Sequence, residues 1–213
     1  MEWHNWVKKY LDAHQVTLLS SVHDTILGGD AIGSQKTVHR VLTRVPPITL
    51  RAASRSPGDV LYAYLRSIGK KYDVRMEQDS HGRSDIAAQP LSAQRSLALI
   101  FEIKSVGRHL KRNWKRSPKT AEQMKKGLEN AKIEALEQLA DRRYRERVPR
   151  HATKVHEFAF VFCGKFCAAT VRTLQRSSAE DWEEVAANST VVSESMTDLG
   201  DEDIGDGNEV SEA

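Results

Sequence analysis

The chain has 213 residues, 39% of them hydrophobic, and a formal net charge of +3 at pH 7. This length predicts one globular domain with some surplus chain. No segment approaches the ~20 consecutive apolar residues that a membrane-spanning helix needs, so we expect no membrane partner. The two cysteines, Cys163 and Cys167, lie in one short apolar stretch and form neither a disulfide framework nor a zinc site. These features favour an intracellular, reducing location.

The small net charge hides an uneven distribution along the chain. No Lys or Arg follows Arg176, so residues 1–176 hold all 32 basic residues but only 17 of the 29 acidic ones. A body this basic predicts a polyanionic partner such as nucleic acid. The alternative interpretation is a solvated basic surface without a partner.

Composition and periodicity divide the chain into three regions. Residues 1–50 are predicted to form an N-terminal helical segment, because Trp3 and Trp6 begin a series of apolar residues at helical spacing. Residues 51–178 combine strand-like and helix-like patterns. Residues 187–213 are rich in Ser, Gly, Asp and Glu and poor in apolar groups, so we predict a disordered acidic tail.

The predicted elements define the fold class. Apolar residues spaced three and four apart predict helices at 2–13, 15–27, 34–44, 56–68 and 120–148. Short alternating or continuous apolar runs predict strands at 72–77, 84–88, 97–104, 155–163 and 168–174. After the N-terminal helices, the order of helix, three strands, helix and two strands predicts an α/β fold, a mixed sheet flanked by helices.

An acid and an amine lie near the end of the strongest predicted strand. Glu102 and Lys104 are two residues apart, so their side chains leave the same face, with Cα atoms about 6–7 Å apart. Asp85 is on the preceding predicted strand, close enough for a hairpin-like pair. Two carboxylates on adjacent strands can hold Mg²⁺, and Lys104 can orient a water or balance negative charge. For a bare Glu-x-Lys, the alternative is a solvent-facing ion pair.

Four motifs in this order resemble a known family. They are Gly82-Arg83-Ser84-Asp85, then Ile100-Phe101-Glu102-Ile103-Lys104, then Ala135-Leu136-Glu137-Gln138-Leu139, and finally Arg142-Arg143-Tyr144. The first two resemble the Asp…Glu-x-Lys core of the PD-(D/E)xK nuclease superfamily. All four together resemble the nuclease domain found at the C-terminus of AAA-ATPase-like proteins, which also occurs in Crinkler-type effectors. The resemblance covers about residues 27–175.

The resemblance implies a restriction-endonuclease-like fold for residues 51–178 and a hydrolase that cleaves phosphodiester bonds, preferably of DNA. It implies catalytic roles for Asp85, Glu102, Lys104 and Gln138, with Mg²⁺ or Mn²⁺ held by Asp85, Glu102 and Asp59. Asp59 stands where the family usually has Glu. No phosphate-binding loop of the Gly-x-x-x-x-Gly-Lys-Ser/Thr type occurs in the sequence, so an ATPase module on another chain is an expected partner.

Further basic residues are candidates for contact with nucleic acid. Residues 107–119 form a basic insertion in which Trp114 can stack on a base, and which also resembles a nuclear localisation signal. The candidates are Arg83, Lys111, Arg112, Trp114, Lys115, Arg116, Arg142 and Arg143.

Two other functions remain open at this point. One is a catalytically inactive nuclease-fold domain that binds nucleic acid or protein. The other is a helical protein that binds a membrane surface or a partner through its N-terminal amphipathic helix, which predicts that the central strands do not form.

Overall fold

The computed structural model describes residues 23–44, 57–66, 71–78, 84–106, 118–141, 144–163, 166–178 and 181–189. The predicted helix at 2–13, most of the basic insertion and the chain after Ser189 lie outside these described residues.

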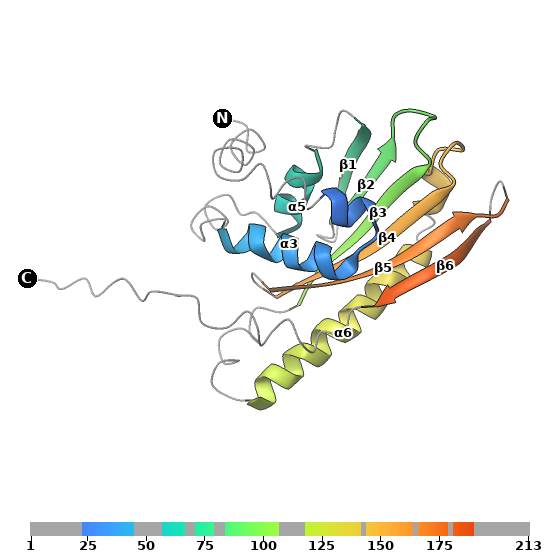
Figure 1. Cartoon of the computed structure of the whole chain (residues 1–213). Coiled ribbons are helices and arrows are strands. Elements are labelled where there is room, and N and C mark those ends of the chain that lie inside the picture. The colour runs from blue at the N-terminus through green and yellow to red at the C-terminus, as the bar shows by residue number, and fades with distance from the viewer. Residues whose placement is uncertain are drawn as a thin grey trace, which may run out of the picture.

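The described strands form one mixed sheet in the order β1-β2-β3-β4-β5-β6 (Figure 1). The strands are β1 (Tyr72–Gln78), β2 (Ser84–Pro90), β3 (Leu97–Ser105), β4 (Lys154–Cys163), β5 (Phe166–Arg176) and β6 (Trp182–Ser189). Neighbours are antiparallel except β3 and β4, which are parallel. Parallel neighbours need a long crossover, and the helix α6 (Pro118–Asp141) lies in it. The predicted α/β fold is confirmed, and the helical alternative without strands is wrong.

One face of the sheet packs against α3 (Ala31–Arg44) and α5 (Pro57–Arg66) (Figure 1). Phe101, Phe158 and Phe160 form a stack on this face, with ring centroids between 5.3 and 6.3 Å apart. Side chains alternate between the two faces of a strand. The residues directly before and after each of these phenylalanines along its strand therefore belong to the opposite face.

Helix α3 is part of this core, although its sequence lies within residues 1–50. It begins after Asp30, whose Oδ1 accepts a hydrogen bond from the backbone N of Gly33 at 2.9 Å, an N-cap that satisfies an end of the helix. Val38 and Leu42 are four residues apart and both are buried with the phenylalanine stack.

The opposite face packs against α6 and is called the α6 face below. Leu128 packs against Val161 near the end of β4, whereas Leu139 packs against Ile100 and Val155 near the starts of β3 and β4. The helix therefore runs antiparallel to these two strands. This direction decides which helical residues lie beside each part of β3.

Two predicted boundaries are wrong. The long helix ends at Asp141 instead of continuing to 148, and a short 3-10 helix, η3 (Tyr144–Arg147), lies further along the chain. A straight continuation would carry Val148 away from the sheet, against which it is buried. Strand β2 continues through Pro90, beyond its predicted end at residue 88, because Pro90 pairs with Tyr72 of β1.

Strand β6 is absent from the predicted elements. It pairs antiparallel with β5 and extends to Ser189, so it includes the first three residues of the region predicted as a tail. Glu183, Glu184 and Val185 of this strand are exposed. An edge strand of this kind lacks the apolar pattern that marks buried strands.

Candidate active site on the α6 face of the sheet

Glu102 is buried on the α6 face of the sheet. It lies between Phe101 and Ile103, which face the other core, and its exposed fraction is 0%. Lys104 follows on the same face, and its side chain is 12% exposed. Its Nζ donates a hydrogen bond of 3.1 Å to Oε2 of Glu134 on α6. The expectation that Glu102 and Lys104 share a face is confirmed.

Asp85 lies on β2, the antiparallel neighbour of β3. The pairing of β2 with β3 ends at Ile86 and Phe101, and Asp85 and Glu102 are the next residues on the two strands. On its other side Asp85 pairs with Glu77 of β1. The hairpin-like pairing of the two strands is confirmed, and the convergence of the side chains in one cleft stays a prediction.

The two supporting residues lie on opposite sides of the sheet. Gln138 is half-buried on α6, one helical turn after Glu134, so it shares the helix side that meets Lys104. Asp59 is in the first turn of α5, whose Leu61 and Leu65 pack against the other face. The structure therefore does not bring Asp59 to the face that carries Glu102.

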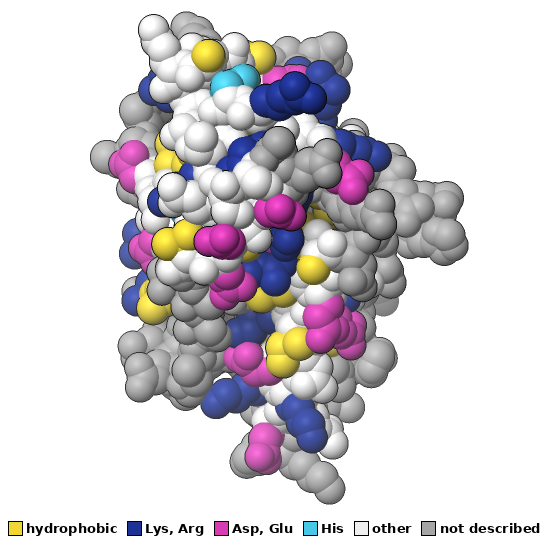
Figure 2. All heavy atoms as spheres, turned by 90° about the vertical axis from the view of Figure 1, so that its right-hand side faces the viewer, with side chains coloured by type: hydrophobic (Ala, Val, Ile, Leu, Met, Phe, Trp, Pro, Cys, Tyr) yellow, Lys and Arg dark blue, Asp and Glu magenta, His cyan; other side chains and the backbone are white. Residues whose placement is uncertain are grey.

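The predicted nucleic-acid contacts lie in segments outside the described residues. This applies to Arg83, Lys111, Arg112, Trp114, Lys115, Arg116, Arg142 and Arg143. On the face shown in Figure 2, basic and acidic side chains are interspersed. Among the described residues, that view shows no continuous basic stripe along which a phosphate backbone could lie.

Two residues near the site are missing from the sequence-based candidates. Glu134 is one, since nothing in the sequence pairs it with Lys104. Lys132 is the other: it is 2% exposed, and its Nζ lies 2.8 Å from Oε2 of Glu129. Lys132 is four residues after Leu128, on the apolar stripe of the helix, and this spacing is a signal that could have identified it.

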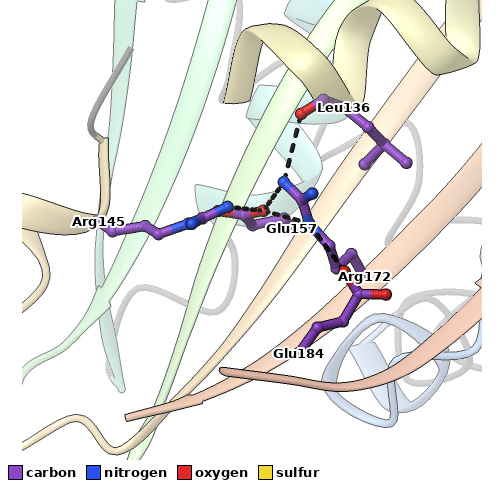
Figure 3. Close-up of polar contacts among 5 residues, drawn as sticks. All are labelled: Leu136, Arg145, Glu157, Arg172 and Glu184. Carbon is purple, nitrogen blue, oxygen red and sulfur yellow. Dashed lines mark hydrogen bonds and ion pairs between the residues drawn. The ribbon is translucent and has the colours of Figure 1, made fainter. Parts of the chain in front are cut away.

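A buried ion network lies on the same face, one strand away (Figure 3). Glu157 of β4 is 0% exposed. Arg145 of η3 donates to its two oxygens at 2.6 and 3.1 Å, and Arg172 of β5 donates to Oε2 at 2.9 and 2.6 Å. Arg172 also donates to the carbonyl of Leu136 and lies 3.9 Å from Glu184. The sequence does not predict this network, because Glu157 lies within an apolar run that predicts only a buried strand.

The described residues contain no cluster of three or more His, Cys, Asp and Glu side chains that could hold a metal ion; the side chain of Asp85 is outside this description. The buried Glu102 carboxylate is an oxygen ligand of the type that Mg²⁺ prefers, and Asp85 directly precedes Ile86, the last residue of β2 that pairs with β3. No described helix is both long and apolar enough to cross a membrane.

The comparison with protein families agrees with this architecture. The model of the PD-(D/E)XK nuclease superfamily matches residues 58–171, which run from the start of α5 into β5 and include the whole candidate site. The match spans more than half of the chain, and the chain belongs to the PD-(D/E)XK nuclease superfamily. A search of curated protein sequences gives no match. Nucleases of this superfamily generally use divalent metal ions.

Proposed function

We propose that this protein is a metal-dependent nuclease that hydrolyses phosphodiester bonds of DNA, with Asp85, Glu102 and Lys104 at its centre. The observation that carries the proposal is the position of Glu102: fully buried, on the sheet face that carries Lys104, and one register step beyond the pair Ile86–Phe101. A carboxylate is costly to remove from water unless it is paired or binds a cation. In a member of the nuclease superfamily, such a carboxylate would bind the metal ion.

Each residue has a separate role in this proposal. Asp85 and Glu102 would hold Mg²⁺ or Mn²⁺ from adjacent strands. When bound, such an ion polarises the phosphate and lowers the pKa of a water. Lys104 would hold the attacking water and balance the negative charge that develops on the phosphate. Gln138 stays a supporting candidate from α6, whereas Asp59, in the first turn of α5 on the other face of the sheet, has no role in this proposal.

Glu134 positions the side chain of Lys104 in this proposal. Its carboxylate is 66% exposed and accepts the 3.1 Å hydrogen bond from Lys104. Lys104 is a flexible point charge, so this contact holds the amine against α6, on the face that carries Glu102. We infer that Glu134 positions Lys104 and does not itself touch the substrate.

The wider setting follows from the motifs. The pattern from Ala135 to Tyr144 supports kinship with the nuclease domain of AAA-ATPase-like proteins and Crinkler-type effectors, and hence an ATPase module on another chain as a partner. The basic insertion, residues 107–119, would bind the phosphate backbone, and its basic run supports a nuclear location.

A second candidate function is nucleic-acid binding without cleavage. The observation that favours it is the same Lys104–Glu134 ion pair. The carboxylate of Glu134 partly neutralises the positive charge that Lys104 would present to a phosphate. The two candidates differ in one measurable property, which is cleavage in the presence of a metal ion.

The test compares cleavage and binding in matched variants. Glu102→Gln removes the charge and keeps the volume, and we expect no cleavage of DNA with Mg²⁺ or Mn²⁺ but unchanged or tighter binding. Lys104→Ala should also be inactive, because its charge acts mainly in the transition state. Glu183→Gln, on the exposed β6, and Lys126→Ala, on the exposed side of α6, are the controls and should keep full activity.

Binding without cleavage by the unaltered protein, with either metal, would replace the nuclease by the second candidate. Cleavage that survives Glu102→Gln would show that the site lies elsewhere.

A further inference from the structure

A pocket of about 370 Å³ lies on the α6 face of the sheet. Ala87 of β2 and Ile100 of β3 line it from the sheet, Arg75 from β1, and Tyr144 and Arg147 from η3. Ligand pockets in proteins usually measure about 300–1,000 Å³, so this one suits a small group and not a whole duplex.

The pocket adjoins the candidate active site. Arg75, Ala87 and Ile100 form one row across three strands, because Arg75 pairs with Ala87 and Ala87 with Ile100. Glu102 is two residues further along β3 and on the same face, about 6–7 Å away. A nucleotide unit whose phosphate reached Glu102 would place its neighbouring sugar and base at this row.

The lining of the pocket is suited to a nucleobase with an attached phosphate. Tyr144 is a half-buried aromatic ring packed beside the cluster that contains Ile100. Ala87 lines the pocket from the sheet, and its small side chain leaves room above the strand for a ring. Arg75 and Arg147 are exposed. The guanidinium of Arg75 is partly balanced by Asp73, 2.6 Å away. Aromatic rings and arginines are the groups on which unpaired bases stack.

The wall that carries Tyr144 is held rigidly against the sheet. Arg145, the next residue, is tied to the buried Glu157 by hydrogen bonds of 2.6 and 3.1 Å. Gln89 of β2 also donates to the carbonyl of Arg147 at 2.9 Å. A wall fixed before the ligand arrives loses little entropy on binding.

We propose that this pocket binds one unpaired nucleotide of the substrate, with its base against Tyr144 and a phosphate near Arg75 and Arg147. The proposal rests on the proposed nuclease function and extends it: the enzyme acts where a base can leave the stack, in single-stranded or locally opened DNA. Unstacking a base from a duplex costs a few kcal/mol, which favours such sites over intact duplex.

The experiment measures binding of 5′-dAMP and of deoxyribose 5-phosphate to the full chain without metal, by NMR or calorimetry. Stacking on an aromatic ring should make 5′-dAMP bind at least about fivefold more tightly. Ala87→Leu fills the pocket from its half-exposed floor and Tyr144→Leu removes the ring, and both should abolish this preference. Tyr62→Leu, a half-buried tyrosine of α5 on the other face, is the control and should preserve it.

Equal binding of the two phosphates by the unaltered protein, or a preference that survives Ala87→Leu, would overturn the proposal. If Tyr144→Leu fails to fold, Ala87→Leu decides. Loss of the preference together with normal DNA cleavage in Ala87→Leu would refute the role in the substrate site and leave the nuclease function standing. A pocket-dependent preference without any cleavage by the unaltered protein would refute the nuclease and leave the nucleotide site.

Discussion

Replacing Glu157 by glutamine should destabilise the protein more than any exposed charge change. The variant keeps the shape of the side chain but removes the negative charge that receives four hydrogen bonds of 2.6–3.1 Å from Arg145 and Arg172. Two guanidinium groups then face each other without their counter-charge. An amide also offers only one acceptor oxygen, so part of the hydrogen bonding is lost.

The expected loss follows from burial. Removing one partner of a buried ion pair costs about 3–5 kcal/mol. Glu157 is 0% exposed, but Arg145 is 23% and Arg172 18% exposed, so water can screen part of the repulsion. We therefore expect about 3 kcal/mol, at the lower end of that range. In a domain of this size this corresponds to a fall in Tm of about 6–12 °C.

The assay is urea unfolding followed by tryptophan fluorescence, with Glu184→Gln as the matched control. Glu184 lies 3.9 Å from the same Arg172 but is 46% exposed, so its loss should change the free energy of unfolding by less than about 1 kcal/mol. Equal losses in the two variants, or a loss below about 1 kcal/mol for Glu157→Gln, would refute the argument. A folded Glu157→Gln protein should also bind 5′-dAMP less tightly, because η3 loses its anchor.

Three further predictions concern stability. Gly29→Ala should destabilise the protein, because Gly29 has φ +68° and an added Cβ would lie 2.9 Å from Cε1 of His156. Gly127→Ala on α6 is the control: there the nearest atom to an added Cβ is 3.7 Å away. This second variant should stabilise the protein by about 0.5–1 kcal/mol in thermal unfolding. Burial, and then the charge of Lys154, lower the pKa of His156 from 6.5 to about 4, although a hydrogen bond from the ring to the backbone of Leu27 acts in the opposite direction. The unfolded state therefore takes up the proton first. Stability should thus fall as pH drops from about 6.5 to 4, by at most about 1.4 kcal/mol per unit, and His156→Gln should remove this slope in denaturation curves between pH 7 and 4.5. A chain ending at Ser189 should keep the Tm of the full chain, whereas one ending at 178 should melt markedly lower because β5 loses its partner.

The main secondary-structure elements follow from sequence patterns that are local. The apolar runs in β3 and β4 are confirmed as strands, and the apolar spacing that predicted a helix from residue 120 is confirmed in α6, whose Leu128 and Leu139 are buried. Glu102 and Lys104 share a face because residues two apart on any strand do so. Patterns of this kind depend on neighbours along the chain, so the sequence alone contains them.

The arrangement of charged groups depended instead on distant segments. Only the tertiary structure shows that Glu134 meets Lys104, since the contact requires α6 to run antiparallel to β3. Only the tertiary structure shows that Glu157 is matched by Arg145 and Arg172, or that β6 completes the sheet. Buried charges are tolerated when partners arrive from other elements, and an edge strand is stabilised by the backbone of its neighbour. Neither the partners of a buried charge nor the pairing of an edge strand produces a periodic pattern in the sequence.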